Sequence, residues 1–403
     1  MVQVFGYISV QPDWQVDVAN ARRGVEGTHR FWASAYCSGK DSVHGTVQVD
    51  SAQKADDSPT LTTEGGVSAE YVGPRQLRLS CEGLGIPPEL YSAPRQTLTC
   101  TNILRATGVR AFDVSQFGSL LVAGGDDGVL DVYHASTGEH RVRLDGHVGD
   151  ITCCAFFPSG QVVLSGASDM RLKIWSASDG SNPVTLVGHT AAITDVAIIA
   201  VGKQVLSAAK DGTVRMWTCA DASLNHTFEL SDMPINAIHL AGRTVAVACE
   251  DGRAMLVDLD EASPAVEFGS TGGPPVRALA YDSENHLLVT GRSDAVVDVW
   301  SAKDPGSGPT YSFSRGQAPV SAVHLVYCDA ALPHVCVATE DGQLYLVELT
   351  TTNGQVAGAT VVEDLVAFDV DPISQVRVTP SSSDAATRQD IWAAAQDSRV
   401  CRF

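Results

Sequence analysis

The sequence predicts an all-β fold: a seven-bladed β-propeller preceded by a small β-rich N-terminal domain. Three observations lead to this prediction. A unit of strand, tight turn at an acidic residue and second strand occurs seven times. The turn aspartates are spaced by 42, 42, 40, 43, 47 and 56 residues, close to the period of about 40–45 residues that is typical of propeller blades. A further alternating run precedes each unit, and helical spacing of apolar residues is hard to find.

Each unit has the features of a β-hairpin. Four of the seven turn aspartates are followed by glycine, and an Asp-Gly pair supplies the positive φ that a two-residue hairpin requires. The turn aspartates are Asp127, Asp169, Asp211, Asp251, Asp294, Asp341 and Asp397. The alternating runs that precede them lie at 109–114, 151–157, 193–199, 235–240, 276–281, 320–326 and 374–379. Each repeat therefore supplies an inner strand and a hairpin.

A circular array of blades has to close, because an open sheet edge invites aggregation. The last repeat reaches only its third strand at Phe403, and the run TLTCTNIL at 97–104 lies just before the first repeat. We therefore predict a propeller over residues 96–403 whose last blade is closed by strand 97–104. The long spacing before Asp397 leaves an insertion at about 351–373 and a Ser/Thr-rich segment at 379–387, which we expect to be surface loops.

Residues 1–95 lack the period but contain strand-like pieces, for example HGTVQVD at 44–50 and RQLRLSC at 75–81. The stretch IPPELYSAPR at 86–95 predicts a linker, because proline fixes φ and cannot donate to a strand ladder. We expect residues 1–95 to form a β-rich domain that ends in this Pro-rich linker and packs beside the propeller.

The charge is strongly acidic and unevenly distributed. The formal net charge is −20, of which residues 101–403 contribute −17 and residues 1–100 contribute −3. Such a surface repels nucleic acid and anionic lipid and attracts basic protein partners, or else serves solubility alone.

Targeting and cofactor signals are weak. The sequence shows no apolar run of about 18 residues and no basic stretch before an apolar core at the N-terminus, so we expect neither a membrane span nor a signal peptide. The ten cysteines form no CxxC or Cys/His cluster, which argues against a zinc site or a disulfide framework. We expect a cytoplasmic protein, with the nucleus as a further location, and no metal or cofactor.

Two repeats share a polar signature at identical intervals of 18, 4 and 6 residues. Its members are His147, Ser165, Asp169 and Trp175 in one repeat, and His189, Ser207, Asp211 and Trp217 in the next. This pattern resembles the WD-repeat family, whose blades use such a tetrad as an internal hydrogen-bond network. A Ser–His–Asp set also suggests a hydrolase, but both serines fall inside apolar strand runs and the set occurs twice. We therefore assign the tetrads a structural role and expect no catalytic residues.

The chain also departs from the family pattern. Ser or Thr follows the tryptophan at Trp175, Trp217 and Trp300, where the family usually has Asp, and the other repeats lack the Gly-His pair. We expect those other blades to be held more by packing than by polar networks.

Five further acids are predicted to share one rim, the top face of a WD-repeat propeller. They precede a turn acid or lie three or six residues past a Gly-His pair: Asp126, Asp150, Asp195, Glu250 and Glu340. Each could be a solvated turn residue, but as a set they form a candidate binding face for a basic partner.

Residues 146–219, and above all Cys-Cys-x-Phe-Phe-Pro-Ser-Gly at 153–160, resemble a narrower family, the proteasomal ATPase-associated factors. These are WD-repeat chaperones of the proteasome's regulatory particle. We expect a non-enzymatic protein, and because a closed propeller has no need of a second copy, we expect a monomer before it joins a complex. The resemblance implies binding of the C-terminal domain of a proteasomal ATPase subunit through an acidic propeller face. The alternative is a general WD-repeat scaffold in another complex, and a propeller enzyme is a third and weaker reading.

Overall fold

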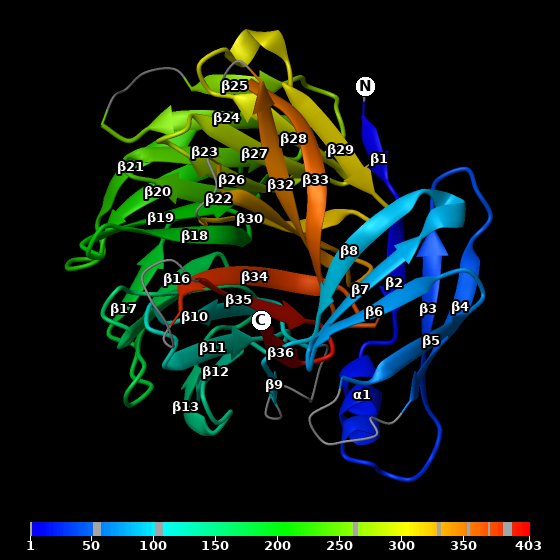
Figure 1. Ribbon diagram of the computed structural model, residues 1–403. Helices are drawn as coiled ribbons and strands as arrows, with labels where there is room; N and C mark the ends of the chain where they lie inside the picture. Colours follow the sequence, from blue (N-terminus) through cyan, green and yellow to red (C-terminus); the bar gives the residue numbers. More distant parts are fainter. Residues whose placement is uncertain are drawn as a thin grey trace.

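The computed structural model describes residues 2–50, 58–100, 108–260, 265–328, 332–352, 355–369, 371–381 and 389–403. Within these residues, seven units of four antiparallel strands follow one another along the chain (Figure 1). The inner strand of each unit packs beside the inner strand of the next, and the seventh packs beside the first. The prediction of an all-β, seven-bladed propeller is confirmed.

The first four blades are built from strands that are consecutive in the chain. Blade one has β10 (Ala111–Val114), β11 (Leu120–Gly124), β12 (Val129–His134) and β13 (His140–Asp145). Blade two has β14 (Ile151–Phe156), β15 (Val162–Ala167), β16 (Arg171–Ser176) and β17 (Val184–Val187). Blade three has β18 (Ile193–Ile199), β19 (Gln204–Ala209), β20 (Thr213–Thr218) and β21 (Leu224–Glu229). Blade four has β22 (Ile235–Ala241), β23 (Thr244–Cys249), β24 (Arg253–Asp258) and β25 (Val266–Gly269).

The last three blades each include or contact a strand from the N-terminal part of the chain. Blade five has β26 (Val276–Asp282), β27 (Leu287–Arg292), β28 (Val296–Ser301) and β29 (Tyr311–Arg315), with a short 3-10 helix at Pro305–Ser307. Blade six has β30 (Val320–Val326), β31 (His334–Thr339), β32 (Leu344–Thr352) and β33 (Gln355–Leu365). Blade seven has β34 (Ile373–Pro380), β35 (Gln389–Ala395), β36 (Arg399–Arg402) and β9 (Gln96–Thr99).

Strand β9 supplies the outer strand of blade seven. It pairs antiparallel with β36, and Leu98 lies opposite Val400. The structure thus contains the predicted closing strand, but it covers Gln96–Thr99, and residues 101–104 of the predicted 97–104 lie outside the described part of the chain.

The apolar core lies between blades. Val122 and Val132 of blade one, for example, share a fully buried cluster with Ile151 and Val163 of blade two. This arrangement follows from the period of two along each strand, which sends alternate side chains to the two faces of a blade. Both faces are covered by neighbouring blades, so the middle strands are apolar almost throughout.

The N-terminal region contains β2 (Tyr7–Val10), β3 (His29–Tyr36), β4 (Val43–Asp50) and β5 (Thr60–Glu64) as one sheet. Helix α1 (Trp14–Arg22) buries Trp14, Val18 and Ala21 against this sheet. The region does not merely pack beside the propeller. Strand β1 (Gln3–Phe5) pairs in parallel with β29 of blade five, which is visible at the right of Figure 1.

Three more N-terminal strands, β6 (Ser68–Gly73), β7 (Gln76–Cys81) and β8 (Ile86–Ser92), continue blade six into a seven-stranded sheet, because β8 pairs in parallel with β33. A 3-10 helix at Glu82–Leu84 connects β7 to β8. The division of the chain at residue 95 stays a prediction.

Two local predictions were wrong. The expected linker at 86–95 begins with strand β8, whose pairing with β7 passes from Ile86 to Glu89 across a register shift. The two prolines between them are exposed and need not donate to the ladder. The insertion at about 351–373 is largely strand, because β32 and β33 extend into a long hairpin. Residues 382–387 of the expected 379–387 loop are outside the described residues, and 379–380 belong to β34.

No helix in the described ranges has the length and apolar character needed to cross a bilayer.

Candidate functional site: the top face and the central channel

The two polar tetrads have the hydrogen bonds that their spacing suggested. Trp175 Nε1 donates to Ser165 Oγ at 2.8 Å, His147 Nε2 lies 2.8 Å from the same oxygen, and His147 Nδ1 lies 2.9 Å from Asp169 Oδ2. Indole can only donate and an ionised carboxylate can only accept. The imidazole therefore donates from Nδ1 to the aspartate, and the serine hydroxyl donates to Nε2.

The second tetrad repeats this geometry in blade three. Trp217 Nε1 donates to Ser207 Oγ at 2.8 Å, His189 Nε2 lies 2.7 Å from Ser207 Oγ, and His189 Nδ1 lies 2.9 Å from Asp211 Oδ2. Burial lowers the pKa of His189 despite the nearby carboxylate, which keeps the ring neutral. Burial acts to raise the pKa of Asp211, but hydrogen bonds from the Thr190 N–H, the Thr213 hydroxyl and His189 lower it to about 2.

The tetrads lack the features of a nucleophile site. Ser165 and Ser207 are fully buried, and each hydroxyl already has an indole and an imidazole as partners. A catalytic serine has to reach a substrate carbonyl beside an oxyanion hole. The tetrads instead fasten the loop that enters each blade to the hairpin turn of the same blade. In blade two, for example, the Val148 N–H donates to Asp169 Oδ2 at 3.1 Å.

All seven hairpin turns share one backbone feature. The residue after each turn aspartate has a positive φ, whether it is glycine or not. The glycines are Gly128, Gly212, Gly252 and Gly342, and the others are Met170, Ala295 and Ser398. In most turns the aspartate also accepts the backbone N–H two residues ahead, as Asp397 Oδ1 does from Arg399 at 2.9 Å. These turns and the loops that enter the inner strands form one rim, which we call the top face.

At the centre of the top face, all seven blades line a cavity of about 560 Å³. Polar side chains at equivalent positions surround its mouth: Arg110, Thr152, Thr194, Asn236, Arg277, Ser321 and Ser374. Asp150 and Glu340, two of the predicted acids, line the same cavity together with Lys210. This mouth is therefore mixed in charge.

Two more of the predicted acids lie on the top face but are paired with arginines. Asp126 forms an ion pair with Arg110, and Glu250 lies 3.6 Å from Arg277 while it accepts a hydrogen bond from Asn236 at 2.8 Å. The structure thus brings Asp126, Asp150, Glu250 and Glu340 to one rim without making that rim uniformly acidic.

The assignment of Asp195 to the top face is wrong. Its carboxylate accepts the backbone N–H of Ile238, on the inner strand of the next blade, at 2.9 Å and that of Val196 at 2.8 Å. Burial raises the pKa of Asp195. Asp195 lies within strand β18 and not in the loop before it. Its side chain therefore links blade three to blade four.

Asp195 is one of several polar side chains that link inner strands. Asp113, His239 and Gln375 likewise accept a backbone N–H from the next blade, those of Phe156, Tyr281 and Phe112, at 2.6, 3.2 and 2.8 Å. The last of these joins blade seven to blade one. Sequence reasoning missed this set, although its signal was present as single polar residues inside otherwise apolar inner-strand runs.

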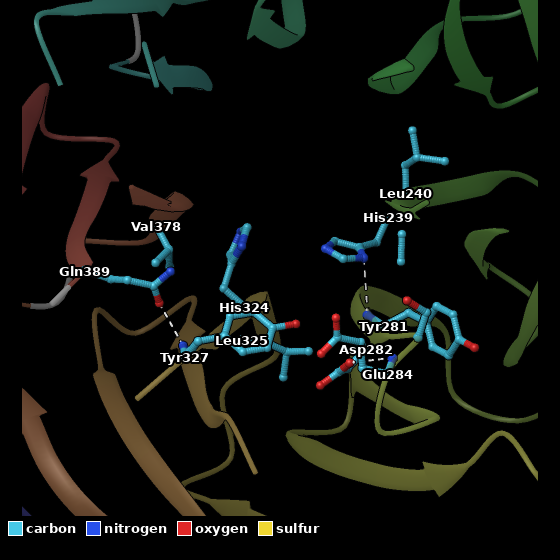
Figure 2. Close-up of a pocket in the computed structure, with 12 residues that line it drawn as sticks. His239, Leu240, Tyr281, Asp282, Glu284, His324, Leu325, Tyr327, Val378 and Gln389 are labelled. Carbon is cyan, nitrogen blue, oxygen red and sulfur yellow. Dashed lines mark hydrogen bonds between the residues drawn. The ribbon is translucent and has the colours of Figure 1, made fainter. Parts of the chain in front are cut away.

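The inner strands also carry charged and titratable groups around Arg377. Arg377 Nε donates to Asp113 Oδ1 at 2.9 Å. Burial, with the positive charge of Arg377, lowers the pKa of His239 to about 4 and that of His324 to about 3. Both histidines line a second cavity of about 530 Å³ at the opposite face, and Figure 2 shows their rings projecting into it. In the described part of the chain, no three His, Cys, Asp or Glu side chains gather as a metal site requires.

Comparison with known protein families identifies the repeat type. Residues 98–134, 138–176 and 180–218 match the WD40 family, described as the WD domain, G-beta repeat. These three segments are similar to WD40 repeats. Each matched segment covers the outer strand of one blade and the first three strands of the next, from β9 to β20, and together the segments include both tetrads. The remaining WD40-like blades follow the same hairpin geometry with fewer of the polar residues.

Several curated proteins resemble the chain over part of its length. Proteasomal ATPase-associated factor 1 from Homo sapiens is 37% identical over 153 residues, which are 38% of this chain and 36% of that protein. The protein of the same name from Bos taurus is 29% identical over 151 residues, again 38% and 36% of the two chains. A protein from Dictyostelium discoideum named probable proteasomal ATPase-associated factor 1 is 28% identical over 156 residues, which are 39% of this chain and 34% of that protein. The chain thus spans little more than a third of the length of these relatives, and the predicted resemblance is confirmed.

Proposed function

We propose that this protein is an assembly chaperone of the proteasome regulatory particle, whose WD40 propeller binds the C-terminal domain of a proteasomal ATPase subunit. The observation that carries the proposal is the similarity to relatives named for association with a proteasomal ATPase. The net charge of −20 favours a basic partner and fast, electrostatically steered association.

Binding rather than catalysis is part of the proposal. The polar groups of the Ser–His–Asp sets are already engaged in structural hydrogen bonds. The top face instead presents a rim of turns around a cavity with a polar mouth. All ten cysteines are free thiols, which supports a reducing compartment such as the cytoplasm or nucleus. A closed ring of blades has no need of a second copy, so we propose a monomer before complex formation.

The test is a binding titration of the full chain against each isolated C-terminal domain of the proteasomal ATPase subunits, at low and at high salt. We expect tight binding to one or two of them that weakens as salt rises, because screening acts on exposed charge pairs. Binding to none of them would overturn the proposal and leave the alternative, a WD40 scaffold in another complex.

The top face is tested by charge reversal within the same assay. Asp150→Lys and Glu340→Lys alter two acids at the cavity mouth that form no ion pair with an arginine among the described residues, and we expect each to weaken binding several-fold. Glu139→Lys is the matched control, because Glu139 is exposed in a hairpin at the opposite face. An equal loss from all three variants would point to general electrostatics instead of a top-face contact.

A further inference from the structure

Three exposed apolar side chains gather on the top of blade two. Val148 is 87% exposed, Val187 is 65% exposed and Met170 is 42% exposed. The three segments that carry them touch one another. Val148 donates its N–H to Asp169, Met170 follows Asp169, and Val187 pairs with Arg171 across β16 and β17. We call Val148, Met170 and Val187 the blade-two patch.

Met170 is energetically unfavourable in the unbound protein, both for its backbone conformation and for the exposure of its side chain. Its φ is 65°, in the left-handed region where four of the other turns have glycine. The two other non-glycine residues at this position, Ala295 and Ser398, are only 3% and 2% exposed, so their side chains are packed inside the protein. Met170 alone of these three combines an unfavourable backbone with an apolar side chain held in solvent. Strain of this kind concentrates at functional sites.

The patch is held on a rigid support. The tetrad below it fixes the loop of Val148 to the turn of Met170 through His147 and Asp169. Because the loop and the turn are already fixed, a partner binds these side chains without the entropic cost of ordering the backbone that carries them.

The rim of the patch is acidic on the side of blade one. Asp127 and Asp145 are both exposed there. The turn of Asp127 is in close contact with the loop of Val148, because a Cβ on Gly128 would lie only 2.7 Å from the His147 carbonyl oxygen. Arg171 is exposed next to Met170 and opposite Val187. Arg143 lies near both Asp127 and Asp145 but is paired with the buried Asp131, so this edge keeps a net negative charge. A partner that covers all three apolar side chains would therefore meet carboxylates along one edge.

We propose that the blade-two patch is the primary contact point for the protein partner. Its occupant is a folded domain that presents an apolar side chain flanked by lysine or arginine. The inference rests on the proposed function and specifies where on the top face the ATPase domain binds. The apolar contact provides residence time, and the carboxylates of Asp127 and Asp145 orient the basic flank.

The test uses the full chain and the ATPase C-terminal domains of the previous assay. The double variant V148S/M170S should raise the dissociation constant at least tenfold. The control is Val201→Ser, since Val201 is 75% exposed in the loop between β18 and β19, at the opposite face. We expect this control to bind as the unaltered protein does. The paired reversal D127K/D145K should slow association and reduce its dependence on salt.

Met170→Gly separates binding from stability. It relieves the left-handed backbone and removes an exposed apolar group, so we expect a higher melting temperature together with weaker binding. If the unaltered chain binds an ATPase domain and V148S/M170S binds equally well, the patch assignment is wrong and the proposed function stands. If the unaltered chain binds none of the domains, both are wrong. Equal weakening by Val201→Ser would also overturn the patch.

Discussion

At the scale of single residues, the buried hydroxyls of Ser165 and Ser207 hold together the tetrads of blades two and three. Each joins an indole, an imidazole and, through that ring, a turn carboxylate. Blade five has a reduced version in which Trp300 Nε1 donates to Thr290 Oγ1 at 3.0 Å. The expectation that blades without Gly-His depend more on packing stays a prediction, and it can be measured.

We expect Ser165→Ala to lower the free energy of unfolding by about 1–3 kcal/mol, because it leaves two buried polar groups, on His147 and Trp175, without their partner. Urea unfolding followed by tryptophan fluorescence measures this change. Ser178→Ala is the control, since Ser178 is exposed in the same blade. A loss no larger than that of the control would contradict the structural role of the tetrad.

The channel histidines give a second residue-scale expectation. His239 and His324 have pKa values of about 4 and 3, below the 6.5 of an unfolded chain, so the unfolded state binds protons first as the pH falls. Their contribution to stability is complete above about pH 6.5 and is lost as the pH falls toward the folded-state values. Glu89, with a pKa raised to about 7 by burial, acts in the opposite direction over part of this range.

Imidazole resonances followed by NMR between pH 7.5 and 4.5 report the two rings directly. We expect both rings to stay neutral to below pH 5, well below the value of about 6.5 for histidine in an unfolded chain. Protonation of His239 and His324 near pH 6.5 would show that burial does not hold these rings neutral.

At the scale of elements, the short strand β9 joins the two ends of the propeller. It is four residues long, yet it brings the start of the propeller to its end by pairing with β36. Its side chain Leu98 is buried in a cluster with Phe112, Leu121 and Trp392, which belong to blades one and seven. A polar substitution of Leu98 should therefore destabilise both blades.

We expect Leu98→Asp to destabilise the protein by about 3–5 kcal/mol, because it places an unpaired charge in an apolar cluster at the junction. Hydrogen exchange should rise in β10, β34 and β36 together. Val266→Asp is the matched control, as Val266 is exposed on the outer strand of blade four. Exchange confined to β9 itself would mean that the junction does not depend on this strand.

At the scale of the whole molecule, a buried cation joins the N-terminal region to two blades. Arg315 ends β29, is fully buried, and bonds both Asp364 of β33, at 3.0 Å through Nη2, and Glu89 of β8, at 3.2 Å. Tyr345 stacks against its guanidinium, with the ring centroid 4.8 Å away. The ion cluster lies where β8 is added to blade six, so the N-terminal region is integrated into the propeller rather than appended to it.

We expect Arg315→Met to destabilise the protein by about 3–5 kcal/mol, because two carboxylates are left buried without their counter-charge. Hydrogen exchange should increase in β1 and β8, and the loss of stability should grow as the pH rises above about 7, because Glu89 then has to ionise without its counter-charge. Arg78→Met removes an exposed pair with Glu70 and should change stability by about 0–1 kcal/mol. Similar losses in the two variants would argue against a joining role for Arg315.

The sequence by itself determined the repeat, the hairpin turns, the inner strands and both tetrads. These features are local or periodic. An aspartate before a positive-φ residue and an alternation of apolar residues leave the same trace in every blade, and the tetrad members keep fixed intervals because they lie within one repeat.

Only the tertiary structure decided the rest. The position of Asp195 depends on which residue of the next blade it meets, and the strand β8 depends on a partner more than 270 residues away in β33. The pairing of Asp126 and Glu250 with arginines similarly arises between neighbouring blades or strands. Such contacts are set by how blades pack around the channel, and packing between distant segments leaves no period in the chain. The blade-two patch belongs to the same class, because exposure is a property of the assembled surface and not of any residue in it.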